Sequence, residues 1–126
     1  MAKVLLVGLG SFLGGIARYV LSGFVHRHLG TAFPYGTMVV NVVGCLVIGG
    51  VLHLVEDRSV LGPDVRLFIA VGLIGGFTTF SAFGYETVAL LRDSDLRFAL
   101  LNIAGNLLLG LGAVWLGRTI LRAVGV

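Results

Sequence analysis

The sequence predicts an all-helical integral membrane protein in which four helices cross the bilayer. Of its 126 residues, 57% are hydrophobic and only 12% are charged, and the mean hydropathy is +1.04. A soluble domain of this length could not bury so much apolar surface. Four apolar stretches, each long enough for the ~20 helical residues that cross a bilayer, are separated by short polar segments. We therefore expect residues 1–126 to form a single transmembrane domain.

The first two predicted helices cover residues 4–25 and 36–55. The first apolar run is too long for the apolar core of a signal peptide, and no convincing cleavage site follows Arg18 inside it. We therefore expect it to be retained as a helix. Pro34 and the basic residues before it separate the two stretches.

The third predicted helix, residues 65–91, has a weak helix-forming sequence near its centre. Gly75 and Gly76 lie close to the β-branched Thr78 and Thr79, so we expect the helix to break here, near the bilayer midplane. Backbone groups freed at that depth must be satisfied by protein or by an ion, and transporters use such unwound carbonyls to coordinate cations. The fourth helix is predicted over residues 96–121.

Four helices joined by short loops place both ends of the predicted bundle on one side. The basic residues are then almost balanced between the two sides: Lys3, Arg58, Arg66, Arg118 and Arg122 against Arg18, Arg27, Arg92 and Arg97. Because Lys/Arg asymmetry sets orientation, this balance predicts insertion in both orientations, which favours an antiparallel homodimer. A single orientation set by other signals is the alternative.

Polar side chains within the predicted helices are candidate functional residues, because they are costly in a bilayer. Basic and amide donors dominate the set, which is Arg18, Asn41, Thr78, Thr79, Ser81, Glu86, Asn102 and Asn106. We find no nucleophile with a base, no phosphate-binding loop and no metal-ligand cluster, so no enzyme is predicted. Asn102 and Asn106 share one helix face, where interhelical hydrogen bonding and pore lining are both open. For Arg18, extension of the side chain to the headgroups is the alternative to ligand binding.

Two phenylalanines beyond the predicted break suit a small anion. Phe80 and Phe83 project from one side of the helix, and the positive edges of their rings can hold a partly dehydrated anion weakly. Ser81, Asn41 and Asn106 can add neutral donors, which let an anion leave again, as conduction requires. Simple packing of the two rings is the alternative. In an antiparallel dimer the two breaks would face each other, and their carbonyls would form a cage suited to sodium.

Three motifs resemble those of the CrcB/Fluc fluoride channels. The most specific is GGFTTFSAF at residues 75–83, with Glu86 shortly after. GTMVVN at residues 36–41 looks like the second-helix signature of these channels, and GGIARY at residues 14–19 looks like their first-helix motif. The resemblance covers the whole chain in length, helix count and motif order. It implies a dual-topology antiparallel homodimer with two fluoride pores and a central structural sodium ion, which lets cytoplasmic fluoride leave through the inner (plasma) membrane of a microbe.

The resemblance also implies roles for individual residues. By position, these are backbone oxygens of Gly75 and Thr78 for sodium, Phe80, Phe83 and Asn41 for the pore, and Arg18 for the pore entrance, where it would attract anions. The chain departs from the family pattern at Ala82, where a hydroxyl residue is usual, and at Asn106, where serine is common. Membership of a continuous hydroxyl ladder is therefore not predicted for Ser81.

Two other functions fit a short membrane protein. A small multidrug exporter is also four-helical and often of dual topology, but it uses a carboxylate in its first helix, where this chain has Arg18. A purely structural membrane partner would need neither a broken helix nor the polar donors.

Overall fold

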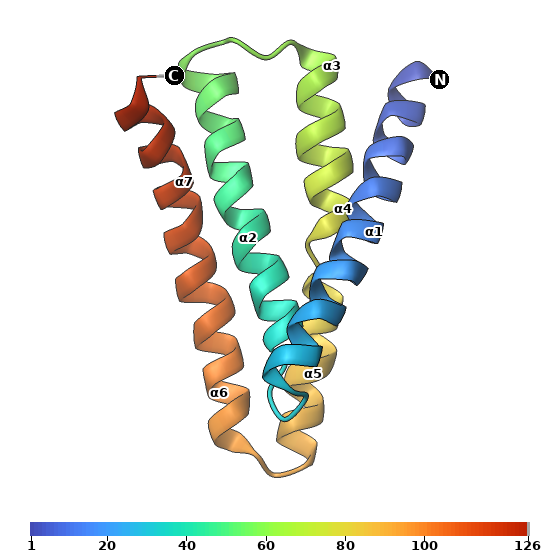
Figure 1. Cartoon of the computed structure of the whole chain (residues 1–126), viewed down its shortest axis with the longest axis vertical. Coiled ribbons are helices and arrows are strands. Elements are labelled where there is room, and N and C mark those ends of the chain that lie inside the picture. The colour runs from blue at the N-terminus through green and yellow to red at the C-terminus, as the bar shows by residue number, and fades with distance from the viewer. Residues whose placement is uncertain (126) are drawn as a thin grey trace.

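Four long helical segments make up residues 1–125, the part of the chain that the computed structural model describes (Figure 1). They are α1 (Ala2–Leu29); α2 (Tyr35–Leu52) continued by the π-helical η1 (His53–Asp57); α3 (Pro63–Arg66), the π-helical η2 (Leu67–Ile74), α4 (Gly75–Phe77) and α5 (Phe80–Arg92); and α6 (Leu96–Ala104), the π-helical η3 (Gly105–Leu109) and α7 (Gly110–Val124). Each segment is long and apolar enough to cross a membrane. The predicted all-helical architecture with four such helices is confirmed.

Short loops make the four segments run alternately up and down, so that α1 begins and α7 ends at the same end of the molecule (Figure 1). Local signals mark the helix ends. Gly30 after α1 has a φ of +79°, a conformation that glycine adopts without strain. Pro63 occupies the first turn of α3. A backbone N–H at this position would have no acceptor within the helix, so proline, which lacks the N–H, is well tolerated there. The Asp95 side chain caps α6 by accepting a hydrogen bond from the Phe98 N–H at 3.2 Å.

Glycines allow α1 to pack closely against η2 and α4. A Cβ atom on Gly10 would lie 2.9 Å from the Gly72 Cα, and one on Gly76 would lie 2.6 Å from the Ser11 carbonyl oxygen. Such distances leave no room for any side chain larger than hydrogen. The α1 helix and the third segment therefore cross closely, as small residues allow helices to do in membranes.

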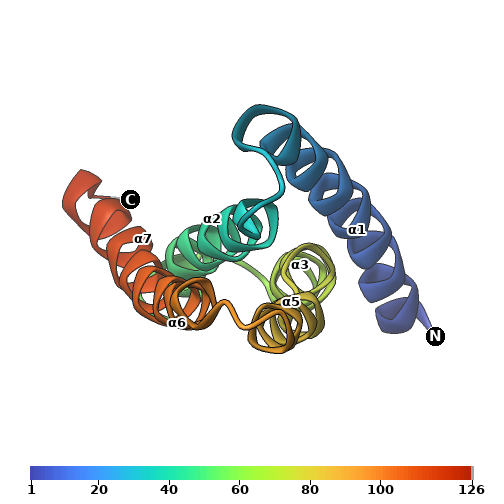
Figure 2. The ribbon, with the colours of Figure 1, turned by 90° about the horizontal axis from the view of Figure 1, so that it is seen from below.

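The α2 helix lies at the centre of the bundle, with α6 and α7 on one side and α1 on the other (Figure 2). Gly49 and Gly117 bring α2 and α7 together, because a Cβ atom on either would collide with the backbone of the facing helix. The largest fully buried side chains are Val40 on α2 and Asn102 on α6. One of these two buried side chains is therefore an asparagine, although its segment is apolar.

The outer surface of the bundle is apolar. Phe12, Leu108 and Trp115 are each about two-thirds exposed or more, and many other large hydrophobic side chains share this exposure. A soluble monomer rarely presents so extensive an apolar surface. Together with the four membrane-length helices, this surface identifies a multi-pass membrane protein.

The third segment is not helical at Thr78 and Thr79. Thr78 has φ/ψ of −77°/159° and Thr79 has −150°/114°, both extended conformations between α4 and α5. The predicted weak point included the preceding glycine pair, but Gly75 and Gly76 are themselves helical. The lack of a side chain at Gly76 serves the contact with α1 instead.

Candidate functional site

Asn41 of α2 pairs with the backbone of the interrupted segment. Its Oδ1 accepts a hydrogen bond from the Thr79 N–H at 2.9 Å, and its Nδ2 donates to the Thr79 carbonyl oxygen at 3.1 Å. The Thr79 hydroxyl in turn accepts from the Ala82 N–H at 3.2 Å, which caps the start of α5. Both backbone polar groups of Thr79 are therefore satisfied without a helix, as a low-dielectric interior requires.

These bonds free two carbonyl groups. In an uninterrupted α-helix the Thr79 N–H would donate to the Gly75 carbonyl, and the Ala82 N–H to the Thr78 carbonyl. Each N–H donates to a side chain instead. The oxygens of Gly75 and Thr78, to which the family resemblance gives the role of binding sodium, thus lose their helical donors. A hard cation binds such carbonyl oxygens well.

Two cavities border the interruption, and Thr79 lines both. The narrower cavity, about 390 Å³, lies between α2, the interrupted segment and η3. Eight residues were given a role in the fluoride path or the sodium site, and six of them line this cavity: Asn41, Gly75, Thr78, Phe80, Phe83 and Asn106. The ring centroids of Phe80 and Phe83 are 5.4 Å apart, with the rings tilted at 58°. Phe80 is 79% exposed, so its ring is accessible from outside this single chain.

The other two predicted site residues lie elsewhere. Arg18 lines the wider cavity, about 630 Å³, and among residues 1–125 it forms no salt bridge. The Ser81 hydroxyl lies 3.3 Å from the Thr79 hydroxyl but lines neither cavity. Ala82 lines the wider cavity without offering a hydroxyl.

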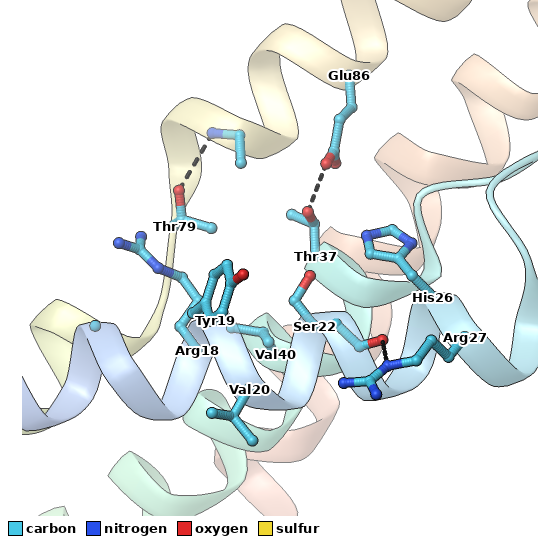
Figure 3. A pocket seen from close by; sticks show the side chains of 13 residues that line it. Arg18, Tyr19, Val20, Ser22, His26, Arg27, Thr37, Val40, Thr79 and Glu86 are labelled. Carbon is cyan, nitrogen blue, oxygen red and sulfur yellow. Dashed lines mark hydrogen bonds between the residues drawn. The ribbon is translucent and has the colours of Figure 1, made fainter.

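Glu86 and Thr37 meet in the wider cavity (Figure 3). The Thr37 hydroxyl donates to Glu86 Oε1 at 2.6 Å, while Glu86 Oε2 is buried without a hydrogen-bond partner among the described residues. His26 lies beside them, and its buried Nδ1 also has no partner there. Arg18 and Arg27 line the same cavity, so it presents two cationic side chains against one carboxyl group.

A chain of amides links α2 to η3, α6 and α5. Asn41 Nδ2 donates to Asn106 Oδ1 at 2.9 Å, and Asn106 Nδ2 donates to both the carbonyl and the Oδ1 oxygen of Asn102, each at 3.0 Å. Asn102 Nδ2 donates to the Thr87 hydroxyl at 2.9 Å, which donates to the Phe83 carbonyl at 2.7 Å. Asn102 therefore serves interhelical hydrogen bonding, one of the two roles open from the sequence.

Sequence reasoning missed Thr37, His26 and Thr87. Thr37 and Thr87 are hydroxyl residues inside apolar stretches, which is a signal that could have found them. His26 belongs to a basic segment that was assigned to a loop, whereas α1 continues through it to Leu29. Its place beside Glu86 depends on how α1 packs against α2, which no local pattern shows.

Comparisons with known proteins point to one family. Residues 5–118 match the family described as CrcB-like protein, Camphor Resistance (CrcB). The chain is 47% identical to a fluoride-specific ion channel FluC of Opitutus terrae, over all of this chain and 96% of that protein. It is 44% identical to proteins of the same name from Methylobacillus flagellatus (97% of this chain, 96% of that protein) and Nitratidesulfovibrio vulgaris (93% and 94%). Each of these relatives is named as an ion channel rather than an enzyme.

Proposed function

Because the chain belongs to the CrcB-like family, we propose that it is a passive, fluoride-selective channel that lets fluoride leave the cytoplasm through the inner membrane. The observation that carries this proposal is the narrower cavity, where the rings of Phe80 and Phe83 lie beside the Asn41 amide and an unwound backbone. The names of the curated relatives support the same function. They also favour it over a small multidrug exporter.

The proposed path joins the two cavities at Thr79. Arg18 and Arg27 in the wider cavity raise the local anion concentration. The narrower cavity then offers the positive edges of Phe80 and Phe83, which replace part of the hydration of fluoride without holding it tightly. Neutral groups dominate this part of the path, so the anion can leave again.

The amide of Asn41 has a double task in this proposal. Both of its N–H groups already donate to protein acceptors, the carbonyl of Thr79 and Oδ1 of Asn106. An anion gains an N–H from Asn41 only by displacing one of these acceptors. We therefore assign to Asn41 first the support of the extended backbone, and second a weak contact with the passing ion. Asn106 borders this path as a further polar group. The Ser81 hydroxyl lies behind the Thr79 hydroxyl, 3.3 Å from it, and supplements the path only through that contact.

A structural sodium ion at the dimer interface belongs to the same proposal. The carbonyl oxygens of Gly75 and Thr78 fit it, because side chains have taken the N–H groups that would bond them in a helix. Two carbonyls from one chain are too few for a hard cation, whereas two copies would supply four. When bound, the ion would hold the two interrupted segments together electrostatically.

We propose an antiparallel homodimer of dual topology with two pores. The near balance of basic residues between the two ends supports it. The exposure of Phe80 also supports the dimer, because a single chain leaves this aromatic ring uncovered beside the cavity. A second copy against this face would complete the wall of each path.

Fluoride efflux from sealed liposomes tests the function. Liposomes loaded with potassium fluoride should lose fluoride slowly until a potassium ionophore dissipates the charge imbalance, and rapidly afterwards, because a channel moves net charge. Protein-free liposomes and liposomes loaded with potassium chloride are the controls. Fluoride efflux that requires an opposing proton gradient, or equal efflux of chloride, would contradict the proposal.

A further inference from the structure

We propose that Asn102 and Thr87 are positioning residues for the fluoride path, although neither lines it. They complete a circuit of hydrogen bonds that begins at the Thr79 N–H and ends at the Phe83 carbonyl, both at the start of α5. This inference rests on the proposed function, because the circuit acts on the segment that presents Phe80 and Phe83. Both residues are buried, and neither borders either cavity.

The circuit is continuous, and each of its donor–acceptor distances is short. Its donor-to-acceptor steps are Thr79 N to Asn41 Oδ1 (2.9 Å), Asn41 Nδ2 to Asn106 Oδ1 (2.9 Å), Asn106 Nδ2 to Asn102 Oδ1 (3.0 Å), Asn102 Nδ2 to Thr87 Oγ1 (2.9 Å) and Thr87 Oγ1 to the Phe83 carbonyl (2.7 Å). All five distances lie in the range of well-formed hydrogen bonds. The circuit starts at Thr79, just before α5, crosses α2, η3 and α6, and ends within α5.

The two backbone ends fix the direction of every bond between them. A backbone N–H can only donate, so Asn41 must turn its oxygen toward Thr79 and its amino group toward Asn106. Each following amide is then oriented in turn. The Thr87 hydroxyl accepts from Asn102, so its own hydrogen is directed to the Phe83 carbonyl. Turning Asn41 or Asn106 around would place donor against donor and acceptor against acceptor, and turning Asn102 around would place its amino group against the amino group of Asn106.

Breaking one bond of this circuit leaves buried groups unpaired. Asn102 is fully buried, so its amino group has no access to water if the Thr87 hydroxyl is removed. An unpaired buried donor is costly, and neighbouring hydrogen bonds in a low-dielectric site weaken with it. The first turn of α5 would then shift relative to α2 and α6. Because Phe80 and Phe83 stand on this turn, the ring edges would move away from the anion.

The test uses three variants that separate the Thr87 hydroxyl from the shape of its side chain. Thr87→Val removes the hydroxyl and keeps the shape, and Thr87→Ser restores the hydroxyl. Thr119→Val is the matched control, because the Thr119 hydroxyl donates to the Trp115 carbonyl four residues earlier at 2.8 Å, outside the circuit. In fluoride-loaded liposomes we expect Thr87→Val to lower fluoride flux on the order of tenfold, as expected for one unpaired buried group. Thr87→Ser and Thr119→Val should keep wild-type flux.

The ratio of fluoride flux to chloride flux separates positioning from general stability. It should fall in Thr87→Val and stay unchanged in Thr119→Val. Wild-type flux and ratio in a dimeric Thr87→Val protein would overturn the inference. If Thr87→Val yields no dimer, Thr87→Cys decides, because its weakly donating thiol should give reduced fluoride flux, and wild-type flux would again refute the inference. A wild-type protein without fluoride flux would refute the proposed function itself, and the positioning role with it.

Discussion

At the scale of single residues, the two phenylalanine rings differ in what surrounds them. Phe80 is 79% exposed in one chain, so it contributes little to the packing of that chain. Phe83 lies one turn further along the same face, and its carbonyl ends the hydrogen-bond circuit. A change at Phe80 should therefore test the path with less disturbance of the fold than a change at Phe83.

Replacing Phe80 by isoleucine should lower fluoride flux while the purified dimer stays intact. Isoleucine keeps an apolar side chain but has no ring edge to face the anion. Taking the contact as comparable to an edge-on contact between two aromatic rings, about 0.5–1.5 kcal/mol, its loss should lower flux by roughly twofold to thirteenfold. Phe12→Ile is the matched control, because Phe12 is 66% exposed on α1 and lines neither cavity. Liposome efflux and size-exclusion chromatography give the two measurements. Equal fluoride flux from the wild type and Phe80→Ile would show that the Phe80 ring does not contribute to the path.

The candidate site could be predicted from the sequence only as far as single residues carry a signal. Asn41, Phe80 and Phe83 stand out because polar or paired aromatic side chains in an apolar stretch are uncommon, and the structure brings all three to one cavity. The partners of Glu86 were not predictable. Thr37 reaches it across two helices, 49 positions away in the chain, and such a contact depends on helix packing rather than on local pattern.

At the scale of the helical elements, the four segments follow from the hydropathy of the sequence. The exact residues at which the third segment is interrupted could not be predicted in this way. Glycine and threonine are both poor helix formers, so propensity could not choose between Gly75–Gly76 and Thr78–Thr79. Tertiary contacts determine where the helix is interrupted. Gly76 packs against the Ser11 backbone while remaining helical, whereas the Asn41 side chain hydrogen-bonds to the extended backbone of Thr79.

The contact between α2 and α7 makes a prediction about stability. A methyl group on Gly49 would collide with the Val114 backbone, whereas one on Gly112 would meet nothing within 4 Å. Gly49→Ala should therefore destabilise the protein by about 1–3 kcal/mol, as overpacking does, and Gly112→Ala should be neutral or stabilising by up to about 1 kcal/mol, because alanine is the better helix former. Thermal unfolding in detergent measures both. A Gly49→Ala protein as stable as the wild type would contradict the close helix contact.

The interrupted segment predicts that sodium stabilises the protein. If the carbonyls of Gly75 and Thr78 bind the ion in the folded dimer only, saturating sodium at about 100 times its dissociation constant should add roughly 2.7 kcal/mol of stability. The midpoint of thermal unfolding should therefore fall when sodium is replaced by N-methylglucamine at equal ionic strength. Potassium chloride at the same concentration shows whether the effect depends on ion size. Identical midpoints in all three salts would argue against a sodium site.

At the scale of the whole molecule, the two ends of the bundle are nearly alike in basic charge. The end at which α1 begins carries Arg58 and Arg118, and Arg118 is paired with Asp57 at 2.6 Å. The opposite end carries Arg92, next to Asp93 at 3.5 Å. Orientation in the membrane responds to the number of Lys and Arg residues near the helix ends rather than to net charge, so such pairing does not change the balance of five against four in the sequence.

The balance of charge predicts that the protein inserts in both orientations. Ser59 lies in the loop before α3 and Ser94 in the loop before α6, at opposite ends of the bundle, and both are exposed (Figure 1). Ser59→Cys and Ser94→Cys, each in a Cys45→Ala background, provide single thiols at the two ends. In cells, a membrane-impermeant thiol reagent should label about half of either protein, and the remainder should react only after the membrane is permeabilised.

A single orientation predicts a different pattern, in which one of these proteins is labelled fully from outside and the other not at all. That result would rule out the antiparallel dimer, because two copies of the same orientation cannot be related by a twofold axis that lies in the membrane plane. The carbonyls of Gly75 and Thr78 would then lack the partner copy that completes their coordination. Since the two cysteine positions report on opposite ends of one bundle, a reagent that leaks across the membrane would label both fully, and the experiment distinguishes this artefact from dual insertion.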